Sequence, residues 1–205
     1  MKIAIFGSTG RTGSELLRRA LRDGHEVTAL VRTLVAIPAQ PGLTVVQGDA
    51  RDADVVAHVI KGADVVLSAL GTDNNTTLTD ATTAIIAAMQ AHGVVRIVTI
   101  GTAGILNSRT EPGKLRYQSS ESKRTTTTAA EAHQRAWELL QASSLAWTVV
   151  CPTYLPDGDA VGTWRIERDV LPTGGARITT GDTAAFAWAE LLSNEHVGYR
   201  VGIAE

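Results

Sequence analysis

Three glycines near the N-terminus, Gly7, Gly10 and Gly13, have a spacing that suits phosphate binding. The first lets the chain turn sharply after a strand, the second lets a phosphate approach the backbone, and the third lets a following helix pack closely on a sheet. The free N–H groups and the positive dipole end of that helix would then face the anion. The spacing alone is a weak signal, because many glycine-rich turns bind no phosphate.

The segments on either side of these glycines have the pattern that a phosphate-binding turn requires. Residues 2–6 (KIAIF) form an apolar run without alternation, which is typical of a strand covered on both faces. The next segment is a predicted helix that Gly24 ends. Its apolar stripe consists of Leu16, Leu17, Ala20 and Leu21. A second apolar run over 27–31 (VTALV) completes a strand, turn, helix and strand, which favours the pyrophosphate site of a dinucleotide-binding fold.

The residue that follows the second strand bears on the choice of cofactor. A fold that prefers NAD normally has an acidic residue there, which accepts from the ribose 2′-hydroxyl, whereas this chain has Arg32. A guanidinium suits bidentate phosphate binding, and Arg11 in the glycine turn can reach the same region. The alternative is that both arginines are only solvated. We expect NADP(H) as the preferred cofactor, with NAD(H) as the alternative.

Strands and helices continue to alternate as far as residue 100. The pattern predicts strands over 43–47, 64–70 and 94–100. It predicts helices over 54–61 and 79–92. Right-handed crossovers between parallel strands give an α/β fold with a doubly wound parallel sheet of the Rossmann type, in the strand order 3-2-1-4-5 with further strands beyond.

In the second half, a predicted helix over 129–142 leads to a sixth strand over 146–151. Asp182 is the predicted N-cap of a last helix over 183–193. Residues 199–201 could form a final edge strand.

Two segments lack periodicity, 101–128 and 153–177. A long loop at the carboxyl end of a strand usually has a function. We therefore expect these segments to form a small appendage on the substrate side of a single NAD(P)-binding domain, residues 1–205.

Composition narrows the function classes. The 205 residues are 44% hydrophobic and 20% charged with a net charge of −2, and no basic run occurs, so we expect neither nucleic-acid nor membrane binding. No apolar stretch reaches the ~18 residues of a membrane span. Because the predicted first strand starts at residue 2, we expect no signal peptide and a cytoplasmic protein. The single cysteine, Cys151, is interpreted as a buried apolar residue, and the isolated histidines predict no metal site.

With these residues assembled, the chain resembles the NmrA-like group of the atypical short-chain dehydrogenase/reductase superfamily. Within it, the chain is most similar to the family of NADPH-dependent flavin reductases typified by biliverdin reductase B. The resemblance covers essentially the whole chain. It depends on residues 2–7 (KIAIFG) with Thr9-Gly10, Leu30-Val31-Arg32, Gly48-Asp49, Leu70-Gly71-Thr72 and residues 89–94 (MQAHGV).

The resemblance implies roles for these residues. The pyrophosphate would be held by the turn that contains Gly7, Thr9, Gly10, Arg11, Thr12 and Gly13. Asp49 and Ala50 would border the adenine, Leu70, Gly71 and Thr72 would line the dinucleotide groove, and Thr102 would lie beside the nicotinamide. Two departures weaken the argument for NADPH, because the family has arginines where this chain has Ala36 and Asp73.

The usual catalytic pair of short-chain dehydrogenases, Tyr-x-x-x-Lys, is absent. Alignment of the helix over 129–142 puts Ala129 at the tyrosine position and His133 at the lysine position. Tyr117 and Lys123 are six residues apart, which does not put them on one helical face. These features exclude alcohol–ketone chemistry by the usual mechanism.

Flavin reduction does not need this pair, because water can supply the proton and the protein mainly has to hold two planar rings in contact. The candidate catalytic residues are Thr102, His133 and Tyr154, with Trp164 as a further neighbour. His133 has an alternative role in helix packing, and Tyr154 has one in covering the core.

Two functions therefore stay open. The first is an NADPH-dependent reductase of a flavin, quinone or tetrapyrrole, as a monomer or homodimer. The second is an NmrA-like regulatory module that senses NADP(H) without catalysis. An open pocket over the nicotinamide would favour the enzyme.

Overall fold

One eight-stranded sheet runs through the molecule in the computed structural model, which describes residues 1–34, 39–73 and 76–205. The strand order is β3-β2-β1-β4-β5-β6-β8-β7. The strands are β1 (Lys2–Phe6), β2 (Glu26–Val31), β3 (Leu43–Gln47), β4 (Val65–Ser68), β5 (Arg96–Ile100), β6 (Ala146–Pro152), β7 (Arg165–Arg168) and β8 (Arg200–Ala204). All neighbours are parallel except β7 and β8. The predicted order 3-2-1-4-5 is confirmed.

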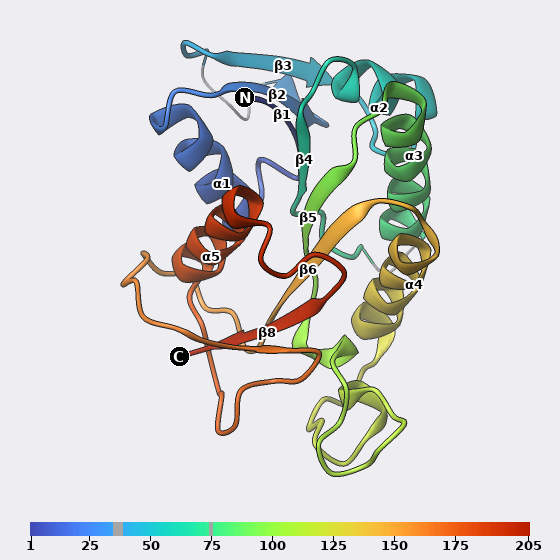
Figure 1. Ribbon diagram of the computed structural model, residues 1–205, viewed down its shortest axis with the longest axis vertical. Coiled ribbons are helices and arrows are strands. Elements are labelled where there is room, and N and C mark those ends of the chain that lie inside the picture. The colour runs from blue at the N-terminus through green and yellow to red at the C-terminus, as the bar shows by residue number, and fades with distance from the viewer. Residues whose placement is uncertain (35–38, 74–75) are drawn as a thin grey trace.

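Helices cover both faces of the sheet (Figure 1). On one face lie α1 (Arg11–Arg22) and α5 (Thr180–Ser193), which pack on each other, and on the other lie α2 (Ala53–Ile60), α3 (Thr77–His92) and α4 (Thr128–Ala142). Side chains alternate along each strand, so the sheet separates two hydrophobic cores. Phe6 packs with the α2, α3 and α4 side, and Ile5 with the α1 and α5 side. The doubly wound α/β prediction is confirmed.

Three predictions for the C-terminal half need correction. The N-cap of α5 is Thr179, whose hydroxyl accepts from the Asp182 N–H, whereas Asp182 lies in the first turn and accepts from the Gly162 N–H at 2.8 Å. The strand expected over 199–201 at the edge is β8, which lies inside the sheet between β6 and β7. Within 153–177 the structure contains an edge strand, β7, that the sequence pattern did not indicate.

The segment 101–128 is folded although it lacks regular periodicity. It contains two short 3₁₀ helices, η2 (Ala103–Ile105) and η3 (Arg116–Gln118), and the greenish-yellow part of the ribbon projects from the body in Figure 1. The Glu121 carboxylate organises it, because it accepts from the Ser108 hydroxyl at 2.7 Å and the Arg109 N–H at 2.6 Å. These donors lower the pKa of Glu121. Ala36, where the resembled family has an arginine, lies outside the described residues.

A buried ion pair ties α5 to the sheet at the amino ends of the strands. Arg96 on β5 donates to the Glu190 carboxylate at 3.1 Å, and both side chains are almost fully buried. Glu190 also accepts from the His196 N–H and the Thr148 hydroxyl. Burial lowers the pKa of Arg96. This network lies far from the carboxyl ends of the strands.

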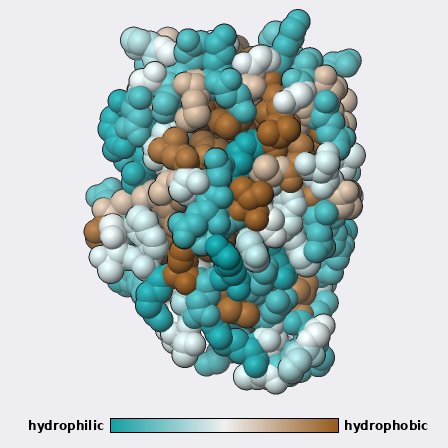
Figure 2. All heavy atoms as spheres, in the orientation of Figure 1, coloured by the Kyte–Doolittle hydropathy of each residue, from teal (hydrophilic) through white to brown (hydrophobic). Residues whose placement is uncertain are grey.

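The face of the molecule in Figure 2 is mainly hydrophilic, with its largest apolar patches in the upper half, where Figure 1 has β1 to β4. None of the described helices is both long and apolar enough to cross a bilayer.

Candidate dinucleotide site and acceptor cleft

A groove runs along the carboxyl ends of β1, β2, β3 and β4. Its lining comprises Gly7, Thr9, Gly10, Leu30, Val31, Arg32, Gly48, Asp49, Ala50, Arg51, Ala69, Leu70, Gly71, Thr72, Asp73 and Thr77. The carboxyl ends of adjacent parallel strands are where ligands bind in open α/β sheets. Nine of the residues proposed from the sequence for cofactor binding lie in this groove. Three, Arg11, Thr12 and Gly13, belong to α1 beside it.

The glycine turn is packed too tightly for side chains. Gly7 has φ +79°, and a Cβ there would lie 2.5 Å from the Ala69 carbonyl oxygen. A Cβ on Gly13 would lie 2.0 Å from the Gly7 carbonyl oxygen. The N-cap of α1 is Gly10, which provides no side-chain hydrogen bond, so the first N–H groups of the helix are left for another acceptor. The turn therefore fits a pyrophosphate.

Two arginines flank the β2 and β3 end of the groove. Arg32 follows β2 with an exposed side chain, as the sequence indicated. Arg51 was not predicted, although its position two residues after Asp49 was a signal. It binds the Asp49 carboxylate through Nε at 3.0 Å and through its terminal nitrogen at 2.6 Å. This pairing lowers the pKa of Asp49 to about 2. The Asp49 carboxylate is thus ionised, and the Arg51 guanidinium compensates its negative charge.

The Arg11 side chain points away from Arg32. Its Nη1 donates to the Leu155 carbonyl oxygen at 2.9 Å and to Asp157 Oδ1 at 3.1 Å. The expectation that its guanidinium shares a region with Arg32 is therefore wrong for this conformation. The cause is the segment after β6, which crosses the N-terminus of α1 and supplies both acceptors. The backbone of Arg11 still belongs to the glycine turn.

A second hollow, here called the acceptor cleft, lies at the carboxyl ends of β5 and β6. It is lined by Arg11, Gly101, Thr102, Arg124, Pro152, Thr153, Tyr154, Leu155, Pro156 and Asp157. β3 and β6 are separated by five spacings in the sheet, so the groove and the cleft together extend over roughly 24 Å. The cleft brings together Thr102 and Tyr154, two residues proposed from the sequence. Tyr154 is 63% exposed.

Thr102 begins the η2 segment, and its hydroxyl accepts from the Gly104 N–H at 3.4 Å. A buried arginine holds this segment in place. Arg200 on β8 donates to the Ile105 carbonyl oxygen and, at 2.9 Å, to the Asn107 side chain. Its guanidinium also lies 3.9 Å from the centre of the Trp137 ring on α4. Arg200 therefore connects the last inner strand to the segment that carries Thr102.

His133 is on α4 and is not among the residues that line the acceptor cleft. Burial lowers its pKa to about 4, so the ring is neutral at physiological pH. Cys151 lies under the cleft, and burial raises its pKa to about 12, so its thiol is protonated. Tyr117 donates to the Gln134 side chain at 2.7 Å, whereas Lys123 is exposed. These placements leave Thr102 and Tyr154 as the candidates beside a reacting ring.

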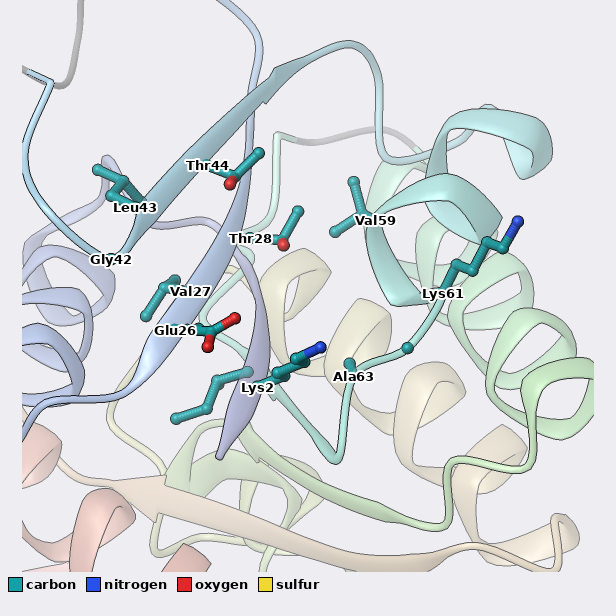
Figure 3. Close-up of a pocket in the computed structure, with 12 residues that line it drawn as sticks. Lys2, Glu26, Val27, Thr28, Gly42, Leu43, Thr44, Val59, Lys61 and Ala63 are labelled. Atoms are coloured by element: carbon teal, nitrogen blue, oxygen red, sulfur yellow. The ribbon is translucent and has the colours of Figure 1, made fainter.

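A third hollow lies at the opposite, amino ends of β1, β2 and β3 (Figure 3). Thr28, Thr44 and Val59 face the same space there, and Lys2 and Glu26 lie near its lower edge. It shares no residue with the groove or the cleft. In the described ranges, no group of three or more His, Cys, Asp or Glu side chains is arranged to hold a metal ion.

A family model described as NAD(P)H-binding matches residues 7–194 of the chain, which includes the groove and the cleft. The chain belongs to this NAD(P)H-binding family. The resemblance to atypical short-chain dehydrogenases/reductases agrees with the membership. Thus a nicotinamide dinucleotide is the cofactor class of this oxidoreductase family.

Several similar proteins align over nearly the whole length of this chain. The uncharacterized protein YwnB of Bacillus subtilis is 28% identical over 98% of this chain and 96% of its own. A solved structure from Bacteroides thetaiotaomicron, named a "putative epimerase", is 30% identical with a TM-score of 0.87 over 99% of this chain and 96% of its own. A third similar protein is a Rossmann-fold NAD(P)-binding family protein from Shigella flexneri, which is 20% identical. Its structure aligns with 100% of this chain and 93% of its own chain, and the TM-score of 0.79 shows the shared fold.

Proposed function

We propose that the protein is an NADPH-dependent reductase that transfers hydride to a free flavin or a similar planar acceptor, such as a quinone or tetrapyrrole. The observation that carries the proposal is the open acceptor cleft, which adjoins the glycine turn at the same edge of the sheet. A reductase needs such a space beside the nicotinamide, whereas a regulatory module that only senses NADP(H) does not.

The groove supplies the residues that would hold the cofactor. The free N–H groups at the start of α1 would bind the pyrophosphate, and Leu70, Gly71 and Thr72 would border the groove on the β4 side. Arg32 lies at the adenosine end, where a 2′-phosphate would lie, whereas the Arg51 guanidinium there is already paired with Asp49. A guanidinium binds phosphate in bidentate geometry, which supports NADPH over NADH.

When bound, the cofactor supplies a hydride from its nicotinamide ring. The protein's own part is to orient and cover the acceptor. Thr102 offers a hydroxyl at the carboxyl end of β5, and Tyr154 offers an exposed aromatic ring across the cleft. Water can supply the remaining proton, so the reaction needs no acidic side chain at this position. Positioning is then the main contribution to the rate.

The absence of the Tyr-x-x-x-Lys pair supports this chemistry over an epimerase or ketone reductase. Ala129 and His133 occupy the two positions on α4. A neutral, half-buried imidazole cannot lower the pKa of a tyrosine in the way an ammonium does.

The test is turnover of NADPH by the purified protein with FMN, riboflavin and menadione as acceptors, followed by loss of the nicotinamide absorbance. We expect turnover with at least one of them, and a reduced kcat in Tyr154→Ala with an unchanged Kd for NADP. Tyr199→Ala is the matched control, because Tyr199 does not line the cleft. Tight NADP binding without turnover of any flavin or quinone would overturn the proposal in favour of a sensor.

A further inference from the structure

The charges in the acceptor cleft do not cancel. Three charged side chains line it: Arg11, Arg124 and Asp157. Asp157 already pairs with Arg11, with 3.1 Å between Oδ1 and Nη1. The remaining lining residues are uncharged. The cleft therefore has an excess positive charge, which comes from Arg124.

The Arg124 guanidinium is available to a ligand. It lies in the segment between η3 and α4, and its side chain is exposed. Its backbone N–H donates to the Ser122 hydroxyl at 3.4 Å, but within the described residues its guanidinium has no hydrogen bond or ion pair. The neighbouring cation, Lys123, is exposed without lining the cleft. Of the adjacent basic residues Lys123 and Arg124, only Arg124 lines the cleft.

The uncharged part of the cleft suits a planar ring. Gly101 and Pro152 line the cleft at the ends of β5 and β6 without long side chains, and Tyr154 presents an exposed ring. A ring seated here would leave its substituents next to Arg124. A guanidinium matches the paired oxygens of a phosphate or carboxylate, and partial exclusion of water by the ring strengthens such a pair.

We propose that Arg124 forms an anion subsite in the acceptor cleft, so that the acceptor is a planar molecule that carries a phosphate or a carboxylate. The inference rests on the proposed function, because it assigns the substrate class of that reductase site. Arg124 is then a specificity-determining residue, and Arg11 is held in place by Asp157.

The experiment compares FMN with riboflavin, which share one ring system and differ by the phosphate. In the wild type we expect a KM about tenfold lower for FMN, which corresponds to about 1.4 kcal/mol. In Arg124→Gln the KM for FMN should rise to the riboflavin value, while the KM for riboflavin stays unchanged. Arg124→Lys should keep part of the preference, and Lys123→Gln should keep all of it. The preference should also shrink with added salt.

A second pair of acceptors separates the two sources of negative charge. A naphthoquinone that carries a carboxylate is compared with its uncharged parent. A preference for FMN alone assigns the subsite to phosphate, and a preference for the charged quinone assigns it to carboxylate. Either result supports the anion subsite.

Binding measured without turnover keeps this inference separate from the reductase proposal. Flavin fluorescence reports the Kd of FMN and riboflavin for the protein loaded with NADP. A Kd preference that Arg124→Gln abolishes supports the subsite even if no acceptor is reduced. Equal Kd values for FMN and riboflavin, or a preference that survives in Arg124→Gln, would overturn it.

Discussion

Replacement of Gly13 by alanine should disrupt the glycine turn. The added Cβ would lie 2.0 Å from the Gly7 carbonyl oxygen and 2.8 Å from its carbonyl carbon. Gly7 cannot move away, because it is packed against the Ala69 carbonyl group, to whose oxygen a Cβ added on Gly7 would lie only 2.5 Å distant. The φ of Gly13 is not in the left-handed region, so the effect is a pure packing clash.

The size of the effect follows from two opposing contributions. Overpacking in a tight site costs about 1–3 kcal/mol, and a contact between backbone atoms places this clash at the upper end. Alanine is more favourable than glycine in a helix by up to about 1 kcal/mol, which offsets part of this cost. The net loss is therefore about 2 kcal/mol, which lowers the Tm of a chain of this length by roughly 4–8 °C. The displaced turn should also weaken dinucleotide binding by at least about tenfold.

The assay is thermal unfolding by circular dichroism, combined with a titration of NADP. Gly71→Ala is the matched control for stability, because a Cβ there meets no protein atom within 4 Å and its φ is also ordinary. Its Tm should stay within about 1 °C of the wild type. If Gly13→Ala kept both the wild-type Tm and the wild-type affinity, the packing argument for the turn would be refuted.

Three further predictions concern residues around the site. Arg32→Ala should weaken NADP binding by about tenfold and leave NAD binding unchanged, and equal losses for both nucleotides would contradict a 2′-phosphate contact. Arg96→Met should destabilise the fold by about 3–5 kcal/mol, because the buried Glu190 carboxylate loses its ion-pair partner. Arg200→Met should cost about 1–3 kcal/mol, because the Ile105 carbonyl loses its buried donor, but only Arg200→Met should raise the acceptor KM at a temperature where both are folded. Stability should fall on acidification from about pH 6.5 to 4 by on the order of 2 kcal/mol, because the folded pKa of His133 is about 4, below its unfolded value, and protonation then favours unfolding. Urea titrations across this range should show a smaller loss in His133→Gln, and an equal loss in both proteins would remove His133 as the cause.

The sequence predicts the first hundred residues well, because their signals are local. The apolar runs of β1 and β3 match the observed bounds, and Gly93 ends α3 in the left-handed conformation, as a C-terminal glycine does. Parallel strands and right-handed crossovers then leave few choices of strand order.

The second half is predicted less well, because its elements depend on contacts distant in sequence. β7 has the sequence RIER and pairs only with β8, so no apolar run indicates it. The cap of α5 is Thr179 because Asp182 is used by the Gly162 N–H, a contact between residues twenty positions apart.

The same reason explains the errors at the site. The direction of Arg11 is set by Leu155 and Asp157, which lie about 145 positions away, and no local pattern records that contact. Arg51 is a different case, because its partner Asp49 lies only two residues away and this local signal was overlooked. Arg124 could not be distinguished from Lys123 until the fold showed which of them lines the cleft.

The most direct test of the central claim is a calorimetric titration of the purified protein with NADPH, with Gly13→Ala in parallel. We expect saturable binding of one nucleotide per chain in the wild type and a clear loss of affinity in the variant. If the wild type released no heat of binding at millimolar NADPH and NADH, the claim that the glycine turn holds a dinucleotide would be contradicted.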